Sequence, residues 1–549
     1  MKRGRLPIWL ALLLLLPMAA FASGAPEGAA ATGTKVNPKG AFPVVNEKIT
    51  LSVFYRQDPL ITDYEDNYET QWLEDKTNIH VNWMLAPSQQ IAEKMNLLLA
   101  SGTDLPDVFM QGTSNTTLMK YGQEGLFKPL NDYIRIYADE LNKIIADLKP
   151  RNVDLLSAYT APDGKIYGLP SVNTCRWCET IWRNWVDVKW MDKLGLKIPN
   201  TVEEFVAMLK AFKTKDPNGN GKADEIPLMG AMTGWGAAVE GYLMMPFIVY
   251  NAQGDRLILD KATGKVTAAY TQPAYLEGLK FIRGLVVDGL LDPVSLTQTA
   301  PEYQVMGEAE PTIVGDHLGS NFPWLTLKDE KYRNMEAIPP LVGVTSGKKQ
   351  TFAYGYQTLG DAVFLISKSC KYPEAAFRWA DYQYSYDNSM LSRYAKKGVD
   401  WVAADPGTKG PFGDPAVFRE VGQWGAPTKN SNRQMFMYLS YDLLNGLQMT
   451  DARGVAVNSD AHYVLRTSKY MDVGISNAVP RVFIPPQQID EYGELSSTLR
   501  TYVAESFARF VAGSLPLSDW DKFQAELKKI GVERFVQMTE AAYKPQYMK

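Results

Sequence analysis

The stretch "KITLSVFYRQDPLITDYEDNYETQWLEDKTNIHVNWMLAPSQQIAEKMNLLLASGTDLPDVFMQG" (Lys48–Gly112) decides the fold class, because strand and helix patterns alternate along it. Runs rich in β-branched and aromatic residues predict strands, and apolar residues at helical spacing predict helices. The strand patterns lie at 48–56, 80–85 and 105–112, and the helix patterns lie at 63–79 and 91–102. This alternation predicts an α/β fold that is doubly wound around a parallel sheet.

The first 45 residues predict export followed by a flexible tether. Three basic residues, Lys2, Arg3 and Arg5, precede the apolar run "LPIWLALLLLLPMAAF", and Ala20-Phe21-Ala22 fits a small-residue cleavage site. We therefore interpret residues 1–22 as a signal peptide and the Gly/Ala/Pro-rich residues 23–45 as a tether. No cysteine lies near the cleavage site, so we expect no lipid-anchor cysteine; a retained apolar anchor is the alternative. The mature chain is expected in the periplasm or outside the cell.

Composition limits the classes of function. The formal charge of −4 becomes −7 when the three leader cations are removed, so no basic surplus favours nucleic acid as a partner. The roughly 525 remaining residues are enough for at least two hydrophobic cores. The chain has 13 Trp and 29 Tyr, more than cores alone require, which leaves some aromatic rings for a binding surface.

Three cysteines are present, at Cys175, Cys178 and Cys370. In an oxidising compartment the C-x-x-C pair is expected either to close a local disulfide or to remain as two free thiols. A zinc site would need two further ligands, and the chain offers only three His and one other Cys, so redox or metal chemistry is disfavoured.

The segment "KDPNGNGKADEIPL" (Lys215–Leu228) looks like half of an EF-hand calcium loop. Calcium takes about six to eight oxygen ligands, and oxygen-bearing side chains alternate here up to the turn-forming Gly221. Pro227 stands where an EF-hand has a bidentate glutamate, so we predict a shortened loop with a structural calcium ion and no sensor role. The alternative is a solvated turn without metal. The predicted ligands are Asp216, Asn218, Asn220, the Lys222 carbonyl, Asp224 and Glu225.

An ordered set of motifs then points to a family. The set is "LPDVFM", "GLFKPLNDYI", "GKIYGLP", "WRNWVDVKWMDKLGLKIPNTVEEF" and "FLISKSCKYPEAAFRWADY". It resembles the extracellular solute-binding proteins of ABC sugar importers (family 1), and the calcium-like loop resembles that of the long alginate- or oligosaccharide-binding type. The resemblance implies a two-lobed periplasmic-binding-protein fold, in which each lobe is a mainly parallel sheet flanked by helices and crossing segments form a hinge. It places lobe 1 at 46–170 and 360–398, and lobe 2 at 171–359 and 399–549.

Candidate ligand contacts follow from the chemistry of sugars, which present hydroxyl edges and apolar faces. In α/β lobes a ligand sits beyond the carboxyl ends of the strands, where polar side chains can meet hydroxyls. Aromatic residues in glycine-rich or loop-like settings can stack on the apolar faces. The polar candidates are Arg56, Asp58, Gln111 and Asp316, and the aromatic candidates are Trp177, Trp235, Tyr242, Tyr356, Trp401 and Trp424.

The predicted function is the capture of an oligosaccharide in the interlobe cleft and its delivery to the permease subunits of an ABC importer. Closure of the lobes does the work, so no residue is expected to be catalytic. We expect a monomer. The alternatives are a binding protein for a peptide or another solute, and a secreted carbohydrate-active enzyme. A glycosidase needs a pair of carboxylates, and no acidic residue here sits in a setting that singles it out, while the βα pattern breaks off well short of eight repeats. The serine-hydrolase motif G-x-S-x-G and the phosphate-binding GxxxxGK[ST] loop are also absent, so the enzyme is disfavoured.

Overall fold

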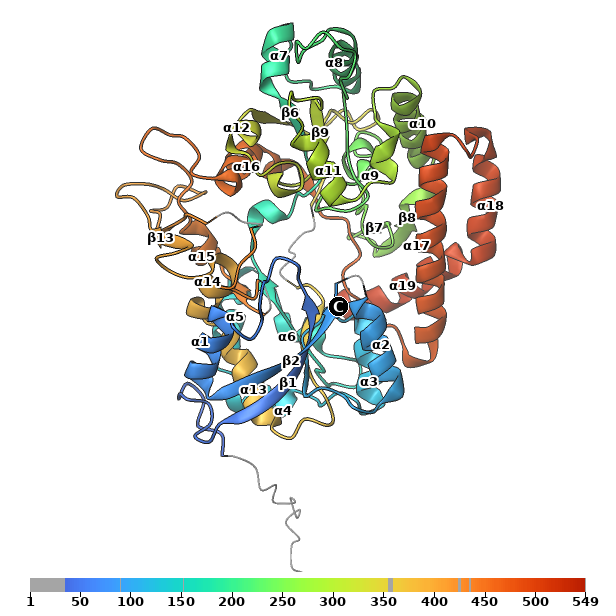
Figure 1. The fold of residues 1–549 in the computed structure, drawn as a ribbon. Coiled ribbons are helices and arrows are strands. Elements are labelled where there is room, and N and C mark those ends of the chain that lie inside the picture. The colour runs from blue at the N-terminus through green and yellow to red at the C-terminus, as the bar shows by residue number, and fades with distance from the viewer. Residues whose placement is uncertain are drawn as a thin grey trace, which may run out of the picture.

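The computed structural model describes residues 35–548, except for residues 89, 152, 354–358, 423–425 and 434–435. The expected signal peptide, most of the tether, Tyr356 and Trp424 therefore lie outside the described residues. The chain forms two α/β lobes, one above the other, with several segments passing between them (Figure 1). No helix in this part of the chain combines the length and the apolar character needed to cross a membrane.

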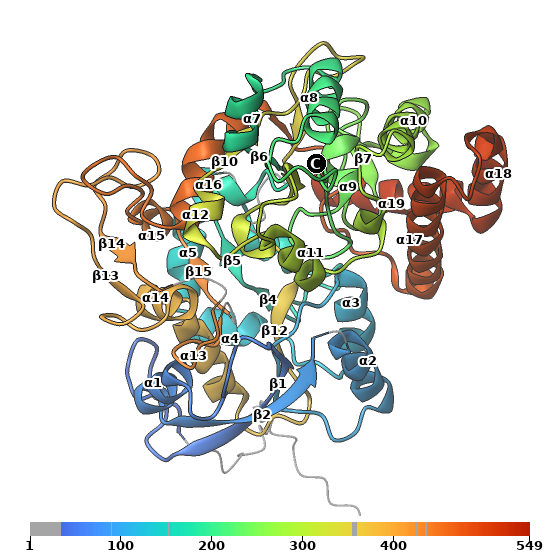
Figure 2. The same ribbon diagram turned by 45° about the horizontal axis from the view of Figure 1, so that its top comes forward.

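Lobe 1 is built on a five-stranded sheet with the order β2-β1-β3-β12-β4. Strands β1, β2 and β3 pair in parallel, and β12 pairs antiparallel with β3 and β4. Helices lie on both sides of this sheet (Figures 1 and 2). The strands are β1 (Ile49–Gln57), β2 (Ile79–Pro87), β3 (Val108–Phe109), β4 (Leu169–Pro170) and β12 (Ala362–Ile366), and the helices are α1 (Tyr68–Thr77), α2 (Ile91–Ser101), α3 (Asn115–Gln123), α4 (Asn131–Tyr137), α5 (Glu140–Leu148), α6 (Leu155–Tyr159), α13 (Pro373–Gln383) and α14 (Tyr386–Tyr394).

Local sequence explains the first elements of lobe 1. Asn67 caps α1 by accepting a hydrogen bond from the backbone N–H of Glu69 at 3.0 Å, and Gly102 ends α2 in the left-handed conformation. The strand and helix patterns at 48–112 are thus confirmed.

Lobe 2 contains a three-stranded sheet with the order β10-β6-β9. Single parallel bridges, such as Met229 to His317, add the segment 226–229 to it. The strands are β6 (Asn184–Asp187), β7 (Leu257–Asp260), β8 (Lys265–Ala268), β9 (Asp316–Leu318) and β10 (Met335–Ile338), and the helices are α7 (Val188–Leu194), α8 (Val202–Thr214), α9 (Val239–Leu243), α10 (Pro273–Val287), α11 (Ala300–Gly307), α12 (Asp329–Tyr332), α16 (Ser459–Thr467), α17 (Ile489–Ala512), α18 (Trp520–Ile530) and α19 (Val532–Tyr547).

In the main sheet of each lobe one strand runs against the others, and the hinge explains why. A strand that enters a lobe from the hinge starts at the edge facing the other lobe, whereas the remaining strands end there. Strand β6 follows the first crossing and pairs antiparallel with β9 and β10. Strand β12 follows the second crossing and is antiparallel to β3 and β4. The main sheet of each lobe therefore carries one antiparallel strand, and β7 and β8 form a separate antiparallel pair in lobe 2.

Short parallel pairs connect the crossing segments. Strand β5 (Val172–Asn173) pairs with β15 (Tyr438–Leu439), and β11 (Thr351–Phe352) pairs with β16 (Gly474–Ile475). A separate hairpin, β13 (Trp401–Ala403) with β14 (Phe418–Glu420), and helix α15 (Tyr441–Asn445) lie at one side of the molecule (Figure 2).

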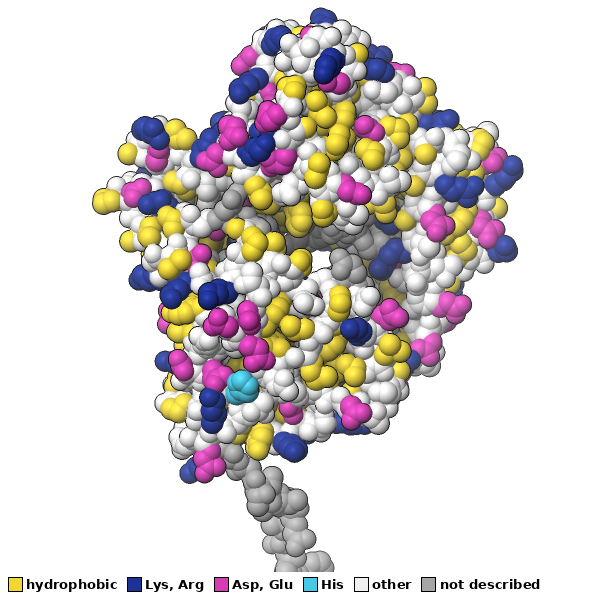
Figure 3. Space-filling view, in the orientation of Figure 1, with side chains coloured by type: hydrophobic (Ala, Val, Ile, Leu, Met, Phe, Trp, Pro, Cys, Tyr) yellow, Lys and Arg dark blue, Asp and Glu magenta, His cyan; other side chains and the backbone are white. Residues whose placement is uncertain are grey.

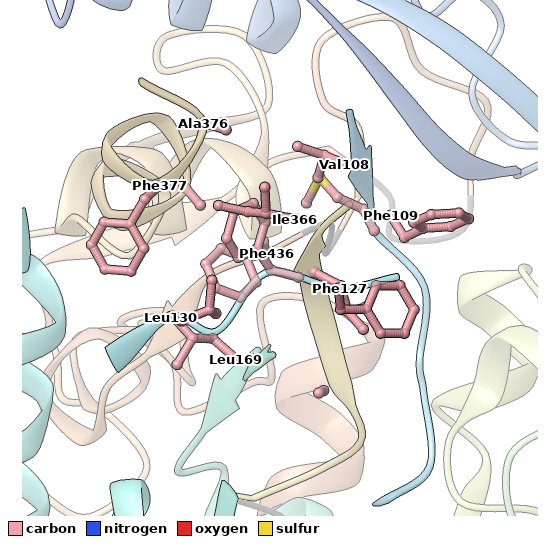
Figure 4. Close-up of a cluster of buried hydrophobic side chains, with 14 of the residues drawn as sticks. Val108, Phe109, Phe127, Leu130, Leu169, Ile366, Ala376, Phe377 and Phe436 are labelled. Atoms are coloured by element: carbon pink, nitrogen blue, oxygen red, sulfur yellow. The ribbon is translucent and has the colours of Figure 1, made fainter. Parts of the chain in front are cut away.

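Each lobe has its own buried core, and the core of lobe 1 also includes residues from near the C-terminal end of the chain. Its core includes residues 44–172 and 362–384, and it also takes Phe436, Phe483 and Ile489 from segments that the sequence division assigned to lobe 2. Figure 4 shows Phe436 among Leu130, Leu169 and Ile366.

The last residues of the expected tether are also packed. Val44 and Val45 are fully buried, and Arg378 donates hydrogen bonds to the carbonyls of Asn37, Pro38 and Ala41. The tether prediction is therefore wrong for residues 35–45, because a distant arginine satisfies their backbone.

Candidate ligand cleft and calcium loop

The lobe 1 edge of the cleft is set by strand direction. The carboxyl ends of β1 and β3 and the amino end of β12 meet at one edge of the sheet. Arg56 lies at the end of β1 and Asp58 directly follows the strand. Arg56 Nη2 is 3.8 Å from Asp58 Oδ2. Gln111 follows β3 and is half-buried. Asp361 precedes β12 and packs against Gly112, where an added Cβ would lie 3.4 Å from the Cβ of Asp361. Four polar residues thus share the edge that faces lobe 2.

A residue from the C-terminal crossing completes this edge. Arg481 forms an ion pair with Asp361 and donates from Nη1 to Asn115 Oδ1 at 3.1 Å. Its guanidinium also lies 6.0 Å from the centroid of the Tyr159 ring. Burial lowers the pKa of Arg481, although the side chain keeps some exposure. The arginine therefore holds the Asp361 carboxylate in a defined orientation.

The lobe 2 edge is formed by the loop 319–324 after β9 and by residues 230–236. Gly236 makes their contact possible, because an added Cβ would lie 2.8 Å from the backbone nitrogen of Ser320. The Trp235 carbonyl accepts a hydrogen bond from the backbone N–H of Ser320 at 2.8 Å. Trp235 and Trp324 are both half-buried, and an added Cβ on Gly234 would lie 3.6 Å from Trp324 Cγ. Two tryptophans are thus gathered at this edge.

Polar atoms at the lobe 2 edge are left without partners. Asn321 Oδ1, Trp324 Nε1 and Thr180 Oγ1 are buried and make no hydrogen bond to any described residue. Such groups are costly unless they meet a polar partner, which a ligand hydroxyl can supply. Figure 3 shows the surface hollowed between the two lobes.

Three sequence candidates do not reach this surface. Trp177 is buried in the turn 176–178, and its ring centroid lies 6.0 Å from that of Phe412, far along the chain. Tyr242 is buried in α9 and donates to the carbonyl of Pro339 at 2.9 Å. Its neighbour Gly241 leaves room for Trp182, since an added Cβ would lie 1.8 Å from Trp182 Cε3. The glycine marks close packing here, and the expected exposure of Trp177 and Tyr242 is wrong.

Asp316 is the third correction. The sequence analysis placed it after a strand, but β9 begins at this residue. Its register partner is Val186, whereas the cleft end of β9 is Leu318 opposite Asn184. Asp316 is fully buried, and burial raises its pKa well above the usual range. It therefore belongs to the interior of the sheet.

The remaining aromatic candidates differ in status. Trp235 lies at the lobe 2 edge, as described. Trp401 is half-buried in β13, where its Nε1 donates to the carbonyl of Ala395 at 3.1 Å and its ring meets Phe418 edge-on. The hairpin therefore positions Trp401. The other two candidates, Tyr356 and Trp424, lie outside the described residues.

Sequence reasoning missed Asp361, Arg481, Asn321 and Trp324. The polar-aromatic run "GSNFPW" directly after a strand was an available signal for the last two. Nothing local marks the pairing of Asp361 with Arg481, which lie on different crossings.

The predicted calcium loop connects α8 to the segment 226–229. The Asp224 carboxylate accepts hydrogen bonds from the amides of Asn218 at 2.9 Å and Asn220 at 3.0 Å. The Asp216 carboxylate accepts from the backbone N–H groups of Gly219 and Gly221 at 2.8 and 3.1 Å. The loop thus folds around its own carboxylates.

The loop also shows where a cation fits. Glu225 Oε1 is buried and makes no hydrogen bond to a described residue. Burial raises the pKa of Glu225, and the nearby charges of Asp216 and Asp224 raise it further. No tight group of three His, Cys, Asp or Glu side chains occurs among the described residues, so the amide and carbonyl oxygens would have to complete the set. A hard divalent cation suits this mixture of oxygens.

The cysteines resolve one open alternative. Cys175 and Cys178 form a disulfide that closes the turn around Trp177, and Cys370 is a buried free thiol.

A separate surface cavity of about 370 Å³ lies beside the β13–β14 hairpin; its lining residues are Arg333, Asp405, Arg419, Asp451, Arg453, Val455, Ala456 and Val457. That cavity is distinct from the interlobe hollow.

Comparison with known proteins places this geometry in context. Residues 58–390 match the family described as bacterial extracellular solute-binding protein. The chain is 28% identical over 529 residues to the fructooligosaccharide ABC transporter substrate-binding protein FusA of Streptococcus pneumoniae serotype 4, covering 91% of each chain.

Solved structures are also similar. FusA in complex with kestose has a TM-score of 0.73 and 26% identity, over 91% of this chain and 99% of that one. An EF-hand mutant of FusA with fructo-nystose has the same TM-score and 25% identity, with the same coverage. The alginate-binding protein AlgQ2 without calcium ion has a TM-score of 0.68 at 21% identity, with the same coverage, and supports the fold alone.

Proposed function

Because the chain belongs to the bacterial extracellular solute-binding proteins, we propose that it captures an oligosaccharide between its lobes and delivers it to the permease of an ABC importer. The observation that carries the proposal is the pair of facing edges. Lobe 2 offers Trp235 and Trp324 for sugar faces, and lobe 1 offers Asp58, Gln111 and Asp361 for hydroxyls. The relative FusA is named for fructooligosaccharides, which supports a carbohydrate ligand.

Closure of the lobes supplies the mechanism. Each lobe has its own core, so each can move as a unit about the crossing segments. A ligand that touches both edges binds the closed form better than the open form and shifts the equilibrium toward closure. The permease is then expected to recognise the closed protein. No bond of the ligand changes in this cycle, and we propose that the protein is not an enzyme.

We further propose that the loop 216–225 holds a structural calcium ion. The side chains of Asp216, Asn218, Asn220, Asp224 and Glu225 and the carbonyl of Lys222 would hold it. When bound, calcium neutralises the mutual repulsion of the three carboxylates. The loop leads into residues 226–229, which run parallel to β9 and end at the cleft. It therefore lies at the opposite end of the lobe 2 sheet, which supports a structural role.

The compartment and partners follow as part of the same proposal. The family is extracellular. We propose export by the signal peptide at 1–22, no lipid-anchor cysteine, and a monomer that meets its permease partners at the membrane. The lobe boundaries given by the resemblance remain part of the proposal, with Phe436, Phe483 and Ile489 reassigned to lobe 1.

The test is binding without turnover. The purified protein is mixed with a panel of oligosaccharides and short peptides in the presence of calcium, and its melting temperature is measured. We expect an oligosaccharide to raise the melting temperature and to be recovered intact by chromatography. Stabilisation by peptides alone would favour the peptide-binding alternative, and cleaved sugars would favour the enzyme.

A further inference from the structure

A buried arginine stands behind the lobe 2 edge of the cleft. Arg183 lies at the end of the first crossing, directly before β6, and only 1% of it is exposed. Its Nη1 donates to the carbonyl of Ser320 at 2.7 Å and to the Ser320 hydroxyl at 3.2 Å, and its Nη2 donates to the carbonyl of Trp177. One side chain therefore joins the cleft loop, residues 319–324, to the turn closed by the disulfide at 175–178.

The charge of Arg183 meets no carboxylate among the residues that the structure describes. Its acceptors are two backbone carbonyls and a hydroxyl, and its guanidinium lies 5.1 Å from the centroid of the Tyr463 ring. Burial lowers the pKa of Arg183 to about 10. A buried cation without a counter-charge is costly, and an apolar side chain would avoid that cost. What only arginine supplies is a planar fork that reaches two segments at once.

Ser320 is the residue through which the cleft loop is held. It is fully buried, and its backbone N–H donates to the carbonyl of Trp235 at 2.8 Å. The preceding residue, Gly319, donates from its backbone N–H to the carbonyl of Arg183 at 3.1 Å. The position of Ser320 therefore sets that of Trp235 in the neighbouring segment. Asn321 and Trp324, whose buried polar atoms face no described partner, follow it in the same loop.

The second segment that Arg183 holds is a constrained turn. Cys175 and Cys178 are joined by a disulfide, and the backbone N–H of Cys178 donates to the carbonyl of Cys175 at 3.1 Å. Trp177 between them is buried. The turn lies in the first crossing, between β5 and β6. The Trp177 carbonyl is thus a fixed point at the hinge, and Arg183 connects it to the cleft loop.

We infer that Arg183 is a positioning residue for ligand binding, which fixes the cleft loop 319–324 against the disulfide-closed turn at the hinge. The inference rests on the proposed function. Groups that are already held in the bound orientation bind more tightly, because less conformational freedom is lost on binding. Arg183 gives Trp235 and Trp324 that fixed orientation when the lobes close, although it does not itself touch the ligand.

Arg378 of α13 offers a matched control. It is also buried, and it donates to three backbone carbonyls, those of residues 37, 38 and 41. These residues lie at the end of lobe 1 that is remote from lobe 2 (Figure 1). Arg183→Lys and Arg378→Lys each replace a planar fork by a single ammonium, so both should lower the melting temperature. Only the first of them alters a segment at the cleft.

The experiment measures sugar binding by both variants. Kestose, maltotriose, mannotriose and trigalacturonate are titrated calorimetrically on the full mature protein with calcium present, below the melting temperature of each variant. We expect Arg183→Lys to bind the tightest of these probes at least about 10-fold more weakly than the wild type, and Arg378→Lys to bind it within about 2-fold of the wild type. Wild-type affinity in Arg183→Lys, or equal losses in the two variants, would overturn the inference and leave carbohydrate capture intact. Failure of every probe to bind the wild type would overturn the proposed function and this inference with it.

Opening the turn gives an independent readout that keeps Arg183 in place. The variant Cys175→Ser/Cys178→Ser removes the disulfide and frees the Trp177 carbonyl to move. We expect it to bind the same probe about 5-fold more weakly than the wild type. Adding Arg183→Lys to it should weaken binding by less than the product of the separate effects, because both changes break one connection. Unchanged affinity in the serine variant, or fully multiplicative losses, would contradict a connection through Arg183.

Discussion

Ile489 and Leu499 lie on the same helix, α17, yet Ile489 is buried in the core of lobe 1 and Leu499 in the core of lobe 2. Lys120 of α3 pairs with Asp490 at 3.1 Å, and near the other end of the helix the Phe510 carbonyl accepts a hydrogen bond from Arg283 Nη1 of α10 at 3.2 Å. Helix α17 thus contacts α3 of lobe 1 and α10 of lobe 2 (Figure 2). Any closure has to be accommodated at its N-terminal end or in the segment that precedes it.

Gly493 lies in this stretch of α17, and we expect Gly493→Ala to stabilise the protein. Its added Cβ meets nothing within 4 Å, so the substitution lowers the entropy of the unfolded chain without a clash. The free energy of unfolding should rise by about 0.5–1 kcal/mol. Gly284→Ala in α10 is the matched control, since its Cβ also meets nothing and its helix belongs to lobe 2 alone. Chemical denaturation should show similar gains, and a loss for Gly493→Ala would reveal strain in α17.

Asp316→Asn should stabilise the protein at neutral and alkaline pH. Burial raises the pKa of Asp316 well above its usual value, and the neighbouring Asn184 offsets this only in part. The folded state therefore holds the proton more tightly than the unfolded state does. The contribution of this carboxyl to the free energy of unfolding is fully present below the usual aspartate pKa of about 4. It falls by about 1.4 kcal/mol per pH unit as the pH rises from there toward the pKa of the folded state.

The asparagine variant has no such loss. Its melting temperature should match that of the wild type at pH 4 and exceed it at pH 8. Asp75→Asn, at an exposed site on α1, should show no comparable pH dependence. A parallel decline of wild type and Asp316→Asn with rising pH would show that this carboxyl is not the cause.

The buried ion pair of lobe 2 should be sensitive to loss of one partner. Arg256 contacts both oxygens of Glu240, with Nε 2.6 Å from Oε1 and Nη2 2.8 Å from Oε2, and the hydroxyl of Tyr250 donates to the same carboxylate. Arg256→Met leaves an uncompensated buried charge and should cost about 3–5 kcal/mol. The double variant Arg256→Met/Glu240→Leu should recover most of that loss. Additive losses in the double variant, measured by denaturation, would argue against this explanation.

Removal of calcium should lower thermal stability and leave ligand specificity unchanged. An ion at 100 times its dissociation constant stabilises the folded state by about 2.7 kcal/mol, and a chelator removes that contribution. Glu225→Gln should abolish the response of the melting temperature to calcium, whereas Asp192→Asn on the exposed surface of α7 should retain it. An unchanged melting curve in chelator would refute the calcium site, and altered sugar preference would refute its structural role.

The predictable part of the fold was the part with local signals. Thr201 caps α8 by accepting a hydrogen bond from the backbone N–H of Glu204 at 3.2 Å, and Phe205, Met208, Leu209 and Phe212 are buried along the helix. Helix periodicity and capping depend on residues within one or two turns, so they can be read from the chain. The exposure of aromatic residues could not be predicted from the chain, because it depends on distant contacts. Trp177 is covered by Phe412, and Gly241 leaves room for Trp182 to pack.

By itself, the sequence determined the alternation of strands and helices, the oxygen-rich loop at 216–225 and the ordered motifs of the family. Each of these depends on neighbouring residues and on the regular geometry of secondary structure. Only the tertiary structure decided that Arg481 meets Asp361, that Phe436 and Ile489 belong to lobe 1, and that Trp324 joins Trp235 at the cleft. These contacts join segments that are distant in the chain, so their existence depends on how the crossing strands place the two lobes.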